Sequence, residues 1–305
     1  MTIAAPVDAS TPGGTQAPRR RRGVLGLPYW LLAPGILWLT LFFVVPMVTL
    51  VSTSLQTGDI DNGYQLTWHW ANYSHALSTY GPQFVRSLEY AGIATVAALL
   101  IGYPLAYTIA FKAGVWKNFL LVLVIAPFFT SFLIRTLAWE TILADNGFVV
   151  RILRDVHLVS SEGRLLATPL AVVCGLTYNF LPFMVLPLYA ALERIDGRLI
   201  EAATDLYASR GTAFRKVTLP LALPGVFAGS LLTFIPAVGD FINAALLGTP
   251  NQYMVGNVIQ AKFLNILDYP TAAALSFLLM GVILVAILLY ARALGTRSLT
   301  EAAAA

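Results

Sequence analysis

Long apolar segments separated by short polar ones make up most of the chain. Six of these segments reach the roughly 20 residues that a helix needs to cross a bilayer. They are rich in Leu, Ala, Val and Phe and are apolar all round, whereas a transmembrane β-strand alternates apolar and polar residues. The pattern predicts an all-α membrane protein with six transmembrane helices, at about residues 30–54, 87–111, 118–139, 168–192, 222–246 and 271–293.

Several prolines fall inside these segments and predict bends in the helices. An internal proline removes a helical hydrogen bond and bends the helix, and a membrane bundle tolerates this where neighbouring groups satisfy the freed carbonyls. Bent helices are common around the path of a transporter, and they are equally compatible with ordinary membrane packing. The prolines are Pro46, Pro104, Pro127, Pro182, Pro187 and Pro236.

The composition supports a protein that is solvated by lipid. Of the 305 residues, 58% are hydrophobic and 11% are charged, whereas soluble domains carry about 25% charged residues. The single cysteine, Cys174, lies in the fourth segment and excludes a disulfide within the chain.

The first apolar run is predicted to be a retained membrane span. The run from Tyr29 to Leu55 follows four arginines but is too long for a signal peptide, and no small-residue cleavage site closes it. We therefore predict a disordered tail at residues 1–28, a six-helix membrane domain at 29–295 and a second tail at 296–305.

The basic residues predict which way the chain is inserted. Basic loops favour the cytoplasm, and an even number of spans puts both termini on the same side. A cytoplasmic N-terminus, and hence cytoplasmic tails, satisfies this rule, and the net charge of +4 then needs no nucleic-acid partner. This orientation places 13 of the 19 Lys and Arg inside: Arg19, Arg20, Arg21, Arg22, Lys112, Lys117, Arg194, Arg198, Arg210, Arg215, Lys216, Arg292 and Arg297.

One polar loop, residues 193–221, is longer than a simple connection between two spans requires. We expect a helix from Asp196 to Tyr207 with Asp196 as its cap, then a shorter helix from Thr212 to Val217 that Pro220 limits. Such a helix pair is suited equally to docking another protein or to resting on the bilayer surface.

The loop resembles a known family. Its sequence, EAATDLYASRGTAFRKVTLPLALPG, is similar to the EAA loop of permease subunits of bacterial ATP-binding-cassette (ABC) importers of the first type. The resemblance implies a type I importer permease fold whose cytoplasmic coupling helices dock on a separate ATPase. The residues that it assigns to coupling are Glu201, Ala202, Ala203, Asp205, Leu206, Tyr207, Ala208, Ser209 and Gly211.

Tyr207 departs from the family pattern, which usually has Gly at this position to allow a positive-φ turn. A bulky residue makes that turn costly. Either Gly211 takes the turn instead, or Tyr207 packs into the ATPase groove.

Further motifs follow in order along residues 30–295 and resemble spermidine/putrescine-type permeases, and among them the B-type partner of a two-permease complex. They are IGYPLAY, APFFTSFLIRTLAW, FLPFMVLPLYAALERID, PAVGDFINAALLG and GNVIQAKFLN. The resemblance implies a multi-pass protein of the bacterial inner membrane that works with a second permease, two ATPase copies and an extracytoplasmic binding protein. It favours a polyamine cargo over other small polar or cationic solutes.

Enzyme chemistry is not indicated in this chain. No G-x-x-x-x-G-K-[ST] phosphate loop occurs, so ATP and Mg²⁺ are expected to bind to partner subunits. His69, His75 and His157 fall in predicted outer loops and form no metal-binding pattern, and we find no catalytic arrangement. An ion-coupled secondary transporter and a channel remain alternatives from other classes.

Asp240 is the strongest candidate for the substrate path, because ionisable residues within a membrane are commonly functional. Asp240 belongs to the motif PAVGDFINAALLG and lies inside the fifth predicted span, four residues after Pro236. Its carboxylate suits a cationic cargo, or else it forms a structural ion pair, for instance with Arg135.

Aromatic rings on the predicted spans are further path candidates, because an ammonium group is attracted to ring faces. Lipid anchoring or core packing would explain the same rings. These candidates are Phe129, Trp139, Tyr178 and Phe180.

Overall fold

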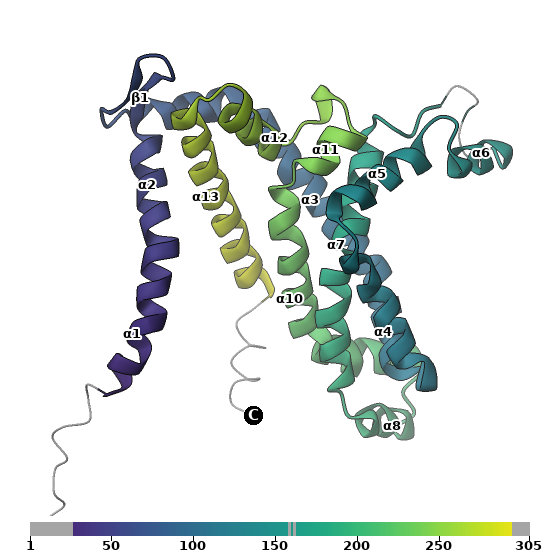
Figure 1. The fold of residues 1–305 in the computed structure, drawn as a ribbon. Coiled ribbons are helices and arrows are strands. Elements are labelled where there is room, and N and C mark those ends of the chain that lie inside the picture. The colour runs from purple at the N-terminus through teal and green to yellow at the C-terminus, as the bar shows by residue number, and fades with distance from the viewer. Residues whose placement is uncertain (1–26, 158–159, 161–162, 295–305) are drawn as a thin grey trace, which may run out of the picture. The chain divides into compact units, whose positions relative to one another are not determined.

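The computed structural model describes residues 27–157, 160 and 163–294 (Figure 1). The chain divides into two units, Met1–Thr49 and Leu50–Ala305. The tails predicted at residues 1–28 and 296–305 lie outside the described part, except that Leu27 and Pro28 already belong to the first helix.

The first unit contains most of the first predicted span, whose last residues belong to the second unit. Helix α1 (Leu27–Leu39) continues through a π-helical turn, η1 (Thr40–Val44), into α2 (Val45–Ser54). Residues Leu32–Ser54 form an apolar helix of 23 residues, long enough to cross a membrane. The wide turn ends two residues before Pro46, and π turns are a common way for a helix to absorb such an irregularity.

Three helices form the centre of the second unit: α3 (Ala71–Phe111), α7 (Pro169–Glu193) and α10 (Leu219–Val238). Small residues let them approach closely, as is typical of membrane helices. A Cβ atom added at Gly229 would lie 2.9 Å from the backbone oxygen of Met184, and one at Gly225 would lie 2.8 Å from that of Pro187. Gly225 and Gly229 therefore lie on the face of α10 that packs against α7. Helix α13 (Tyr269–Leu294) packs mainly on α3.

The third predicted span, 118–139, is wrong as a single helix. The 3₁₀ turn η2 (Gly114–Trp116) leads into α4 (Lys117–Ile125), and a second turn, η3 (Ala126–Phe129), is followed by an extended Thr130. The chain then turns by 97° into the segment Phe132–Asp155, which holds α5 (Phe132–Leu143) and α6 (Phe148–Asp155). Pro127 donates no amide hydrogen at this point, which favours the break.

The fifth predicted span, 222–246, also ends early. Helix α10 stops at Val238, and a separate helix, α11 (Ile242–Leu247), begins after three intervening residues. The side-chain amide of Asn257 donates to the carbonyl of Phe241 at 2.7 Å and so satisfies one group in the break. Asn257 belongs to α12 (Val255–Gln260), which lies between the 3₁₀ turn η5 (Pro250–Gln252) and the π turn η6 (Ala261–Asn265).

A small hairpin between the first two spans was not predicted. Strands β1 (Gln56–Asp59) and β2 (Gly63–Leu66) pair antiparallel, with Gln56 opposite Leu66. The next helix, α3, begins at Ala71 rather than at residue 87, and Asn72 donates to the carbonyls of Ser54 and Gln56, at 3.0 and 2.9 Å. Five described helices are long and apolar enough to cross a membrane, or six if the bent pair counts as one span.

Candidate coupling loop and substrate path

The polar loop after α7 folds into two helices, as the sequence predicted. Helix α8 (Gly197–Asp205) is capped by Asp196, whose carboxylate accepts from the amide of Arg198 at 3.0 Å. Helix α9 (Arg210–Ala213) is capped by Ser209, whose hydroxyl accepts from the amide of Thr212 at 3.3 Å. Both caps satisfy amides that the first turn of a helix leaves free.

Tyr207 itself takes the left-handed turn that ends α8, with φ at +63°. Its amide donates to the carbonyl of Thr204 at 2.9 Å, and the amide of Ala208 donates to that of Ala203 at 3.0 Å. This is the hydrogen-bond pattern of a Schellman motif, with Tyr207 where Gly is usual. Gly211 lies inside α9, so the expectation that Gly211 takes the turn is wrong.

The side chains assigned to coupling are largely open to solvent. Tyr207 is 99% exposed and Leu206 is 81% exposed. Only Ala203 and Ala208 are half-buried, whereas the others are exposed: Glu201, Ala202, Asp205, Leu206, Tyr207, Ser209 and Gly211. In Figure 1, α8 projects from the end of the second unit that lies opposite the hairpin.

The second half of the loop is fixed to the bundle. The ring of Phe214 meets those of Tyr103 and Tyr107 edge to face, with centroid distances of 5.6 and 6.1 Å. From Arg210 the helix runs without a break to Val238, because a π turn, η4 (Phe214–Thr218), joins α9 to α10. The expectation that Pro220 limits the second helix is therefore wrong: the proline lies within the continuous helix, just after the wide π turn, and such a turn is a common way for a helix to absorb an irregularity.

Asp240 lies in the break between α10 and α11, not inside a helix as predicted. It is 8% exposed, and its Oδ1 accepts from the amide of Asn243 at 2.8 Å, which caps α11. Among the described residues no ion pair joins it to Arg135. The guanidinium of Arg135 lies instead 5.5 Å from the ring centre of Phe132, and its buried Nε and Nη1 have no hydrogen-bond partner in the described part.

A buried chain of polar side chains next to Asp240 was missed in the sequence analysis. The side-chain amide of Asn179 donates to Thr136 Oγ1 at 3.1 Å and to Asn243 Oδ1 at 3.0 Å. All three residues are buried, and they come from α5, α7 and α11. Asn179 and Asn243, which stand within apolar segments of the sequence, could have indicated these contacts, because polar groups in a membrane need hydrogen-bond partners.

The aromatic candidates do not form one cluster. Trp139 and Tyr178 pack edge to face at 5.4 Å, and both are half-buried. Phe180 is buried against Phe132, at 5.9 Å. Phe129, at the end of η3, is 86% exposed and has no ring contact among the residues that the structure describes.

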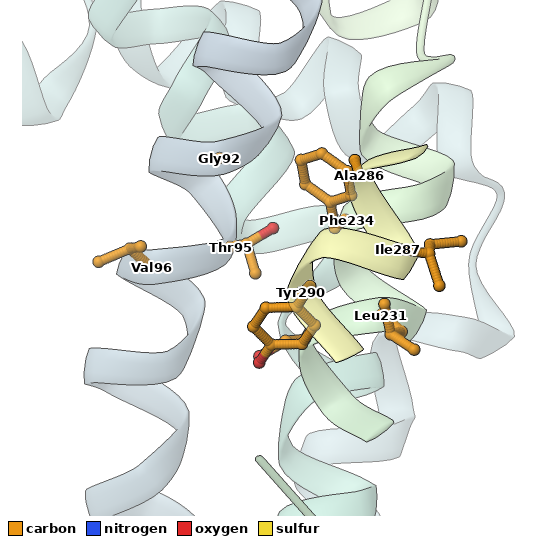
Figure 2. Close-up of a pocket in the computed structure, with 9 residues that line it drawn as sticks. Gly92, Thr95, Val96, Leu231, Phe234, Ala286, Ile287 and Tyr290 are labelled. Atoms are coloured by element: carbon orange, nitrogen blue, oxygen red, sulfur yellow. The ribbon is translucent and has the colours of Figure 1, made fainter. Parts of the chain in front are cut away.

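A groove of about 300 Å³ opens between α3, α10 and α13. Figure 2 shows Thr95, Phe234 and Tyr290 at its opening, one from each helix. Its lining is nearly all apolar and includes none of the predicted path residues, and a polyamine would lose hydration there without a counter-charge. The lining consists of Gly92, Thr95, Val96, Ser230, Leu231, Phe234, Ala286, Ile287 and Tyr290.

The histidines do not form a metal site in the described part of the chain, where no group of three His, Cys, Asp or Glu could hold an ion. His75 lies within α3 rather than in a loop, which corrects the prediction, whereas His69 and His157 lie outside the helices.

Comparison with known proteins gives consistent matches. Residues 98–296 match the family model described as "Binding-protein-dependent transport system inner membrane component". The chain is 40% identical over 257 residues to the spermidine/putrescine transport system permease protein PotB of Haemophilus influenzae, covering 84% of this chain and 90% of that protein. It is 38% identical over 257 residues to PotB of Escherichia coli K12, covering 84% of this chain and 94% of that protein.

Among solved structures, the fold resembles a chain of a bacterial ABC transporter involved in the import of the acidic polysaccharide alginate. The TM-score is 0.65 at 21% identity, covering 87% of this chain and 93% of that one. At this identity the likeness concerns the fold, which is that of an ABC importer permease.

Proposed function

The chain belongs to the family of binding-protein-dependent transport system inner membrane components, the permease subunits of ABC importers, and we propose that it forms half of a translocation path for polyamines. Spermidine and putrescine are the favoured cargo, because they are named for relatives that share 38–40% of their residues with this chain. Another small polar or cationic solute is the second candidate.

The exposed helices α8 and α9 are the surface on which we base the proposal of coupling to an ATPase. We propose that a separate ATPase docks on the face around Glu201, Asp205 and Tyr207, which projects from the bundle and contacts little of its own chain. Because Phe214 fixes the following turn against α3 and the helix continues to Val238, a movement of the docked surface would tilt α10. ATP and Mg²⁺ would bind to two copies of that ATPase.

The complete path would require other polypeptides. We propose a second permease of similar fold for the other half of the path, and an extracytoplasmic binding protein that delivers the cargo. In this scheme α8 and both termini face the cytoplasm, which agrees with the distribution of basic residues.

Asp240 is proposed to attract a cationic cargo. Its carboxylate is buried, and no described Lys or Arg neutralises it. The side chains of Asn243 and Asn179 extend this polar layer to Thr136. Trp139 follows Thr136 by three residues in α5, and the faces of the Trp139–Tyr178 ring pair would favour an ammonium group.

Uptake into proteoliposomes that contain this chain, the second permease and the ATPase tests the class of transporter. ATP-dependent uptake of labelled spermidine is expected when the binding protein is present. Uptake that continues unchanged without ATP and follows a proton or sodium gradient would refute the importer proposal and favour a secondary transporter. ATP-dependent uptake of a different solute alone would refute only the cargo.

A further inference from the structure

Helix α6 leaves part of its apolar face, around Phe148 and Ile152, uncovered by its own chain. At about 100° per residue, the apolar residues of FVVRILRD occupy one side of the helix and the charged residues Arg151, Arg154 and Asp155 occupy the other, with Asp155 directly beside Phe148 at the boundary. Phe148 is 58% exposed and Ile152 is 55% exposed, and Val156, just after the helix, is also 55% exposed. Such a separation of apolar and charged sides is typical of a helix that lies on a surface.

Contacts on the opposite side hold α6 in this position. Val150 is fully buried. Arg154 donates from Nη1 to the carbonyl of Asp145 at 2.8 Å and from Nη2 to that of Gly163 at 3.0 Å, and Arg164 forms an ion pair with Asp145 at 3.2 Å. Phe148 and Ile152 are therefore kept outward, whereas Val150 faces the rest of the chain.

The course of the chain directs α6 along the membrane. The segment Phe132–Asp155 runs at 97° to Gly114–Phe129, so a span that crosses the bilayer through α4 continues roughly in the membrane plane. Figure 1 shows α6 extending sideways from α5 and α7, at the opposite end of this unit from α8. A helix that extends sideways there lies over the bilayer rather than over the bundle.

We infer that α6 is an interfacial helix that lies in the headgroup region of the bilayer. Phe148 and Ile152 reach toward the acyl chains, while Arg151, an exposed cation at the edge of the apolar side, contacts lipid phosphates. The inference needs only that the chain spans the membrane, and it depends neither on the proposed cargo nor on the coupling loop. A soluble binding protein is less suited to this face, because it would approach along the bundle axis.

The test places an environment-sensitive nitrobenzoxadiazole dye on α6 of the full chain, assembled with its partner subunits in nanodiscs of phosphatidylethanolamine and phosphatidylglycerol. In a Cys174→Ala background, Phe148→Cys and Ile152→Cys carry the dye on the uncovered apolar stripe, and Arg151→Cys is the matched control at the charged edge, at the level of the lipid phosphates. Positions 148, 151 and 152 are exposed, and Cys174→Ala replaces a half-buried side chain by a smaller one, so the fold should tolerate each change.

We expect blue-shifted emission at positions 148 and 152 and strong quenching by brominated lipid, with several-fold weaker quenching at 151 and no change when an extracytoplasmic binding protein is added. Emission typical of water at 148 and 152, without lipid quenching, would overturn the inference. Shielding from water without lipid quenching would overturn it too, because another polypeptide would then cover α6, as would shielding that appears only with the binding protein.

Discussion

Tyr207 ends α8 in the left-handed backbone conformation, which residues other than glycine rarely adopt, and its ring is 99% exposed. We expect Tyr207→Gly to stabilise the turn. The left-handed conformation costs a residue other than Gly roughly 1–2 kcal/mol, whereas a new Gly raises the entropy of the unfolded segment by about 0.4–1 kcal/mol. The difference leaves a net gain of about 0.8 kcal/mol, or roughly a fourfold smaller opening constant for α8.

Tyr207→Ala is the matched control, because it removes the ring and keeps the backbone strain. Hydrogen–deuterium exchange of the assembled complex, read on peptides that cover residues 197–208, measures the opening of α8 directly. We expect exchange to be about fourfold slower in the Gly variant than in the Ala variant. Equal rates, or faster exchange in the Gly variant, would refute the reasoning, since the strain would then not reside at Tyr207.

The same two variants also test whether the ring of Tyr207 binds the ATPase, independently of the backbone strain at this position. The exposed ring makes no contact within the described chain that could be lost, so weaker binding of the ATPase in both variants would assign the ring to the partner groove. Tyr207→Phe should then retain most of the binding. ATPase binding that is unchanged in all three variants would exclude the ring from the interface.

Three further predictions follow from other parts of the fold. Glu201→Lys should leave membrane insertion intact and abolish ATPase association, measured by co-purification; normal coupled transport in this variant would contradict the docking proposal. Asp240→Asn should weaken polyamine uptake at least several-fold in proteoliposomes, and unchanged kinetics would make Asp240 a structural cap only. Gly229→Ala should lower the thermal unfolding temperature in detergent, because its Cβ would lie 2.9 Å from the carbonyl oxygen of Met184, whereas Gly281→Ala, with nothing within 4 Å, should not.

The sequence predicted well those parts of the fold where one physical signal dominates. Helices Pro169–Glu193 and Tyr269–Leu294 match the predicted spans within two residues, because their apolar character is uniform and their ends are polar. The capping of α8 by Asp196 was also predicted, because a carboxylate directly before a helix satisfies free amides.

The breaks at Thr130 and Asp240 could not be located from apolar content, because the residues around them stay apolar while the backbone changes direction. The sequence marked Pro127 as a bend but gave no measure of its size. The hydrogen bond from the side chain of Asn257 to the carbonyl of Phe241, in the break after α10, is a tertiary contact that apolar content does not reveal. The partners of Asn179 are likewise a matter of tertiary packing, which the sequence pattern does not contain.

The uninterrupted helix from Arg210 to Val238 has a mechanical consequence. Its 29 residues, at about 1.5 Å each, make a rod about 44 Å long. A rotation of only about 5° around the base of this rod would shift its far end by about 4 Å. Asp240, the one buried carboxylate of the described residues, lies just beyond that end. A small rotation at the Arg210 end would therefore be amplified into a displacement comparable to the diameter of an ammonium group at this carboxylate.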